Sequence, residues 1–72
     1  MHVKFEDFKT GWFGLRVGLT DSDIVDLIDK LTQLRQHKAH FHARSDFSGA
    51  GGVGDIEFYF AEASDTPTLT LE

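Results

Sequence analysis

Hydrophobic and polar residues alternate with a period of two in several segments of the chain, a pattern that predicts β-strands. In residues 2–8, Val3 and Phe5 alternate with charged or polar neighbours. Residues 12–19 alternate in the same way, and a Lys-Thr-Gly turn separates the two segments. Since a short glycine-containing turn favours antiparallel pairing, we expect these segments to form a hairpin.

The same alternation returns in the second half of the chain, from Ala39 to Phe47 and from residue 56 to residue 61. A glycine-rich loop at residues 48–54 connects the two segments, which we expect to form a second hairpin. The first of these strands places polar side chains on one face, namely His40, His42 and Arg44.

A helix is predicted between the two hairpins, because apolar residues there recur at helical spacing. The apolar stripe consists of Ile24, Leu27, Ile28, Leu31 and Leu34. Thr20 and Asp23 have the spacing of a capping box, and the neighbouring acids suit the positive end of the helix dipole. These acids therefore have a structural explanation, and we assign them no functional site.

The order β-β-α-β-β predicts an α+β fold with a four-stranded, mainly antiparallel sheet and one helix packed on one face. The side chains expected beneath the helix are Phe5, Leu15, Val17, Phe41, Ile56, Phe58 and Phe60. Residues 1–63 are expected to form a single domain and residues 64–72 a flexible tail. Leu71-Glu72 resembles the start of a vector-encoded tag and also the end of a short alternating segment, and both origins stay open.

Composition narrows the classes of function. The chain has 72 residues, seven phenylalanines and no cysteine, which excludes thiol catalysis, cysteine-based zinc sites and disulfides. Its net charge of −5 opposes binding to nucleic acids and to anionic membranes. No apolar run approaches the length of a membrane span, so we expect an unprocessed cytoplasmic protein. Because so small a domain buries little surface, self-association is an open alternative.

One helix would cover only one face of the predicted sheet, and the other face would then be free for a partner. That face is expected to carry Trp12, Arg16, His40, His42, Arg44, Glu57 and Tyr59. Tryptophan, tyrosine and arginine are enriched at interface hot spots, so this face favours a protein partner. The alternative is that Trp12 folds over a sheet edge and that the charged residues are simply solvated.

His40 and His42 share a face of their strand, and Glu57 on the neighbouring strand adds a carboxylate, a donor set that suits zinc. Arg44 on the same face would oppose a cation, and two histidines on a solvated or interface face are the alternative interpretation. Asp55 and Glu57 are expected to face opposite ways or to lie at a turn, which gives no paired carboxylates for catalysis. We therefore predict no catalytic residues and no cofactor.

The chain also resembles a group of small bacterial proteins, the immunity proteins of polymorphic toxin systems, over roughly residues 13–60. The segments that carry the resemblance are Gly14-Leu15, Gly18-Leu19, His40-Phe41-His42 and Gly51-Gly52-Val53-Gly54-Asp55-Ile56-Glu57. The resemblance implies an intracellular, non-enzymatic and often acidic protein that binds and occludes a toxin. The positions that match the group's pattern are His40, His42, Gly52 and Asp55, in a folding role or a binding role.

Three hypotheses follow from the sequence. The first is a non-enzymatic protein-interaction domain that acts as an immunity protein against a toxin domain. The second is a homodimeric structural domain whose open face is covered by its own copy. The third is a metal-binding protein that uses His40 and His42.

Overall fold

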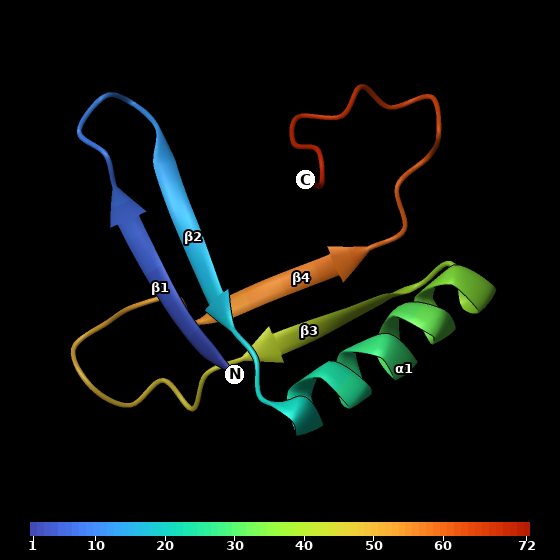
Figure 1. The fold of residues 1–72 in the computed structure, drawn as a ribbon, viewed down its shortest axis with the longest axis horizontal. Helices are drawn as coiled ribbons and strands as arrows, with labels where there is room; N and C mark the ends of the chain where they lie inside the picture. The colour runs from blue at the N-terminus through green and yellow to red at the C-terminus, as the bar shows by residue number, and fades with distance from the viewer.

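The computed structural model describes residues 1–72 and contains one helix and four strands (Figure 1). Their order confirms the predicted β-β-α-β-β sequence and the α+β class. The elements are β1 (His2–Asp7), β2 (Phe13–Gly18), α1 (Asp21–His37), β3 (His40–Arg44) and β4 (Asp55–Tyr59). The helix lacks the length and the apolar run that a bilayer-spanning helix requires.

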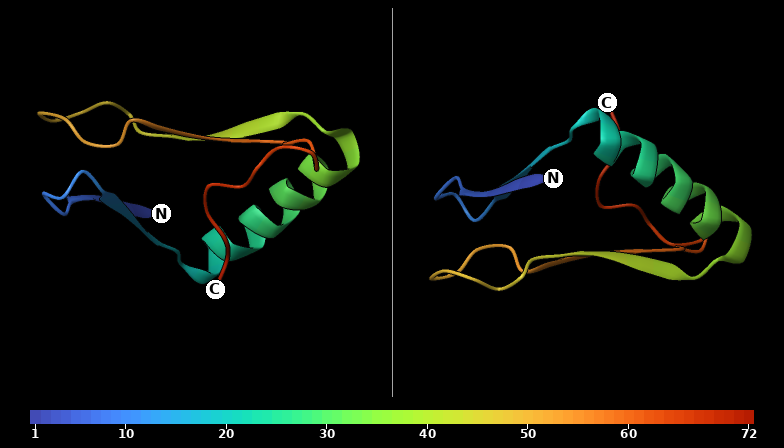
Figure 2. Two further views of the ribbon diagram at one scale, coloured as in Figure 1. Left: turned by 90° about the horizontal axis from the view of Figure 1, so that it is seen from above. Right: turned by 90° about the horizontal axis from the view of Figure 1, so that it is seen from below.

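The strands form two separate two-stranded antiparallel sheets, β1–β2 and β3–β4. The prediction of one four-stranded sheet is therefore wrong. Figure 2 shows the β3–β4 hairpin as one layer, with α1 and the β1–β2 hairpin lying apart from each other on the same side of it. The alternation of apolar and polar residues along a strand determines which of its faces is apolar. It does not determine which other strand will pair with its edge.

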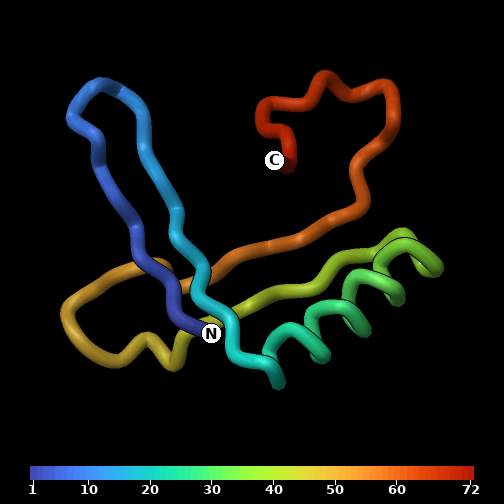
Figure 3. The backbone as a smooth tube through the Cα atoms, viewed as in Figure 1, coloured from blue at the N-terminus to red at the C-terminus, as the bar shows by residue number.

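In the view of Figure 3 the start of β1 overlies the β3–β4 hairpin, and the two hairpins share the lining of one cavity there. At that point Met1 and Val3 line a cavity of about 220 Å³ together with Ala43, Val53 and Ile56. Val3 is the one half-buried residue of β1, whereas the rest of that strand is exposed. Contact between the hairpins is thus limited to one end of each.

The interior of the protein is thin, because none of the 72 residues is fully buried. The half-buried apolar side chains of α1 and the β3–β4 hairpin are Leu27, Leu34, Phe41, Ala43, Ile56 and Phe58. The Phe41 and Phe58 rings stack across this hairpin with their centroids 4.8 Å apart. The other four residues predicted beneath the helix, and three residues of the helical stripe, are exposed, so that part of the predicted core is wrong. They are Phe5, Leu15, Val17 and Phe60, together with the helix residues Ile24, Ile28 and Leu31.

The helix begins as its sequence predicts. The Asp23 backbone N–H donates to Thr20 Oγ1 at 3.1 Å, and the Thr20 N–H donates to Asp23 Oδ2 at 3.0 Å, which confirms the capping box. The amino group of Met1 lies 3.1 Å from the same Asp23 oxygen. The hydrogen bond from Thr20 and the Met1 charge hold the pKa of Asp23 below its ordinary value of 3.8. The ionised Asp23 carboxylate therefore stabilises the folded state at pH values above 3.8, and this contribution is lost as the pH falls through the lower pKa of the folded state.

Thr20→Ala removes the oxygen that caps the helix, and we expect it to lower the free energy of unfolding by about 1 kcal/mol. Urea unfolding followed by helical circular dichroism, at one protein concentration, measures the change. Thr32→Ala is a matched control, because Thr32 lies inside the helix and its hydroxyl donates to the Ile28 carbonyl. That control should be neutral or slightly stabilising, since alanine is the better helix former. Equal losses in the two variants would contradict the capping role.

The helix ends at His37 and is capped by Lys38, which adopts the left-handed conformation with φ of 53°. Its N–H donates to the Leu34 carbonyl at 2.7 Å and so binds one of the last carbonyls of the helix. The chain then turns directly into β3. This short connection places β3 beside α1, which positions the candidate site described next.

Candidate functional site

The polar side chains predicted on the third and fourth strands do share one face of the β3–β4 hairpin. This polar face consists of three cross-strand pairs, which are His40 with Tyr59, His42 with Glu57, and Arg44 with Asp55. Hydrogen bonds of the ladder join the alternate positions, as between Phe60 N–H and the Ala39 carbonyl at 3.2 Å. The polar pairs are therefore the non-hydrogen-bonded pairs of the ladder, in which Cα atoms approach to about 4.5 Å and side chains lie closest.

Asp55 is the centre of the polar interactions on this face. Its carboxylate lies 3.0 and 3.1 Å from His42 Nδ1 and accepts a hydrogen bond from Arg44 Nε at 3.2 Å. Glu57 lies on the same face, with Oε1 3.9 Å from His42 Nε2. The expectation that Asp55 and Glu57 face opposite ways is therefore wrong. The two residues are separated by one residue within β4, and side chains two apart on a strand share a face.

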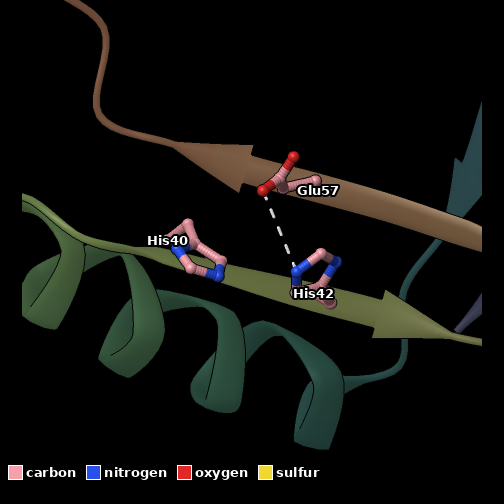
Figure 4. Close-up of side chains that lie close together, drawn as sticks. All are labelled: His40, His42 and Glu57. Carbon is pink, nitrogen blue, oxygen red and sulfur yellow. Dashed lines mark ion pairs between the residues drawn. The ribbon is translucent and has the colours of Figure 1, made fainter.

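The two histidines of β3 also lie close to each other. The rings of His40 and His42 pack edge to face with centroids 5.3 Å apart. Figure 4 shows both rings and the Glu57 carboxylate along the same side of the two strands. One donor atom from each of the three side chains lies within 4.8 Å of the other two, so the group can be considered as a cation site.

Two residues predicted for this face lie elsewhere, and the single seven-residue surface is a wrong prediction. Trp12 lies in the β1–β2 turn, where its carbonyl accepts from the Phe8 N–H at 3.2 Å. Arg16 lies on β2 opposite Lys4, in the other sheet. Of the seven predicted residues, only His40, His42, Arg44, Glu57 and Tyr59 share the polar face, because the two hairpins do not form one sheet.

The glycine-rich loop between β3 and β4 satisfies its polar groups locally. The Ser48 N–H and hydroxyl both donate to Asp46 Oδ1, at 3.0 and 2.8 Å, and these bonds lower the pKa of Asp46 below 3.8. The Phe47 ring covers Gly54, where an added Cβ would lie only 2.5 Å from the ring. A larger residue at this position would therefore displace the exposed Phe47 ring.

A second candidate surface lies on the β1–β2 hairpin and includes three residues that the sequence predicts in the core, Phe5, Leu15 and Val17. One face of the β1–β2 hairpin carries Val3, Phe5, Asp7, Phe13, Leu15 and Val17. Its four exposed apolar residues, Phe5, Phe13, Leu15 and Val17, are called here the apolar hairpin face. Phe5 and Phe13 stack with centroids 5.2 Å apart, yet 60% of Phe5 and 49% of Leu15 are exposed. Large apolar side chains gathered on one face, with no covering element, are typical of an interaction surface.

Comparisons of this chain with protein-family models, with curated proteins and with solved structures found no match. The similarity to immunity proteins therefore stays a prediction from the segments quoted above. The function has to be argued from the two surfaces of the molecule itself.

Proposed function

We propose that this chain is a non-enzymatic protein-interaction domain that works as a homodimer. The observation that carries the proposal is its exposed surface of 6698 Å². A compact monomer of its mass, 8.1 kDa, exposes about 4,500 Å². The chain thus exposes about 2,200 Å² more than a compact monomer does.

The dimensions of the chain agree with this excess. Its radius of gyration is 14.1 Å, whereas a compact domain of this length has a radius of about 11 Å. No disulfide replaces the missing core, because the chain has no cysteine. A chain this open needs another surface to cover it before its hydrophobic side chains stabilise the fold.

The excess area matches the requirement of a stable dimer. If each of two copies buried its extra exposed surface of about 2,200 Å² against the other, the interface would bury about 4,400 Å² in total. This area is within the range of about 2,000 to 5,000 Å² for obligate homodimers. A second copy is the one partner present whenever the chain is synthesised. The apolar hairpin face suits a two-fold interface, because its large side chains form a single patch that can contact the same patch on a twin.

The self-interface proposed here differs from the one that the sequence favours. A homodimer predicted from the sequence alone uses the polar face, because the helix is expected to cover the apolar one. With the apolar side open, the polar face of the β3–β4 hairpin stays free in the dimer for a further protein partner. A toxin domain as that partner stays a prediction from the resemblance.

The shape of the surface supports a binding role over catalysis. The cavity near Met1 and Val3 has a volume of about 220 Å³. Sites for small molecules usually enclose about 300 to 1,000 Å³ and bury most of the ligand. An exposed polar face and a cavity of this small volume suit recognition of a protein surface.

Light scattering on the native protein during size-exclusion chromatography tests the proposal. We expect a mass of twice 8.1 kDa, and a thermal unfolding midpoint that rises with protein concentration. A monomeric mass over the whole dilution series, together with cooperative unfolding at a concentration-independent temperature, would overturn the homodimer.

A further inference from the structure

We propose that the polar face of the β3–β4 hairpin holds one divalent transition-metal cation, for which zinc is the expected ion, through His40, His42 and Glu57. One donor atom from each of these side chains lies within 4.8 Å of the others. In tetrahedral zinc sites the bonds are about 2.0 to 2.2 Å, so neighbouring ligand atoms lie roughly 3.3 Å apart. His42 Nε2 and Glu57 Oε1, at 3.9 Å, are already near that spacing.

The strand register supports the arrangement. His42 and Glu57 form a non-hydrogen-bonded cross-strand pair, in which the two side chains leave the backbone close together. His40 is two residues along the same strand and therefore on the same face. The side chain of Glu57 is 48% exposed and free to rotate toward a cation between the rings.

The hydrogen bond between His42 and Asp55 determines which nitrogen is available to the metal. An ionised carboxylate only accepts hydrogen bonds, so Nδ1 of His42 carries the proton that it shares with Asp55 at 3.0 Å. In the neutral ring Nε2 then has the free lone pair, and Nε2 is the nitrogen that faces Glu57. A carboxylate that holds the outer nitrogen of a ligating histidine is the usual support of zinc sites.

The charge of Arg44, which would oppose a cation, is compensated in the structure. Its Nε donates to Asp55 Oδ1 at 3.2 Å, so the guanidinium charge is paired with a carboxylate. With neutral histidines, the charges of Arg44, Asp55 and Glu57 leave this face with a net negative charge. Imidazole donors favour zinc and its neighbours in the first transition row over magnesium and calcium.

The three side chains leave one position of a tetrahedral ion open for water or for a group of a partner. The site stands independently of the dimer, because the apolar hairpin face belongs to the other sheet. Failure of the metal site would therefore leave the expected mass of the homodimer unchanged. A monomeric mass would likewise leave the expected uptake of zinc unchanged.

Isothermal titration with Zn²⁺, on protein without a histidine tag, tests the site. We expect one ion per chain for the native protein and no comparable uptake for the His40→Ala, His42→Ala double variant. The His2→Ala, His37→Ala double variant is the matched control, since it removes the other two of the four histidines and should bind as the native protein does. Equal zinc uptake by the native protein and the His40→Ala, His42→Ala variant would overturn the proposal.

Two further variants keep the test valid if the double variant fails to fold. Glu57→Gln replaces an exposed ligand with a side chain of the same shape, and it should abolish the visible absorption of tetrahedral Co²⁺ that the native protein is expected to show. Asp55→Asn leaves all three ligands in place but changes the group that orients His42, and it should weaken zinc binding by about 10- to 100-fold. If Glu57→Gln keeps the Co²⁺ absorption and Asp55→Asn keeps the native zinc affinity, the assigned site is wrong.

Discussion

Leu15→Asp is expected to convert the homodimer into a monomer. Leu15 lies at the middle of the apolar hairpin face, directly opposite Phe5 on β1. Burial of its exposed half contributes about 1 kcal/mol, and an unpaired carboxylate at the same place costs several kcal/mol to desolvate. Because a two-fold interface contains this residue once from each copy, both effects occur twice. The dissociation constant of the dimer should therefore rise by at least about 1000-fold.

The loss of the dimer should also lower stability, because folding of so open a chain is linked to association. Arg16→Gln is the matched control, since it is the next residue of β2, lies on the opposite face, and changes the net charge by the same amount, from −5 to −6. Sedimentation velocity and thermal unfolding of both variants measure the effect. If Leu15→Asp keeps the native mass and midpoint, the apolar hairpin face is not the interface.

Phe58→Ala is expected to lower the free energy of unfolding by roughly 2 kcal/mol. Complete removal of a fully buried phenylalanine costs about 3 to 5 kcal/mol, and Phe58 is only half-buried. The substitution also removes the stacked contact with Phe41, in which the ring planes differ by 14°. Such aromatic pairs add about 0.5 to 1.5 kcal/mol beyond their buried area.

Tyr59→Ala is the control for this experiment, because it removes an aromatic ring from the neighbouring residue of β4. Tyr59 is 66% exposed and lies on the polar face, so its loss should cost less than about 0.5 kcal/mol. Chemical unfolding of the two variants at equal protein concentration gives the comparison. Similar losses would show that the Phe41–Phe58 pair does not stabilise the hairpin more than an exposed ring does.

The local structure of this protein was predictable from short stretches of sequence. The capping box of Thr20 and Asp23, the helix and the two hairpins all depend on residues near one another in the chain, and all are confirmed. The parity of the third and fourth strands was also correct, so His40, His42 and Glu57 were placed together. The exact start of β4 was not predicted, and the role of Asp55 was missed because it was expected to face away from Glu57 or to lie at a turn.

The relative placement of these elements required the tertiary structure. Alternation in β1 and β2 marks Phe5, Leu15 and Val17 as apolar, but a strand edge offers the same backbone groups to any neighbour. The sequence therefore could not determine whether the hairpins would join into one sheet or stay separate, nor whether α1 would cover both. By itself the sequence determined the elements, their caps and the faces of their strands, because these depend on local backbone geometry. The tertiary structure decided which faces are covered, because coverage depends on contacts between segments far apart in the chain.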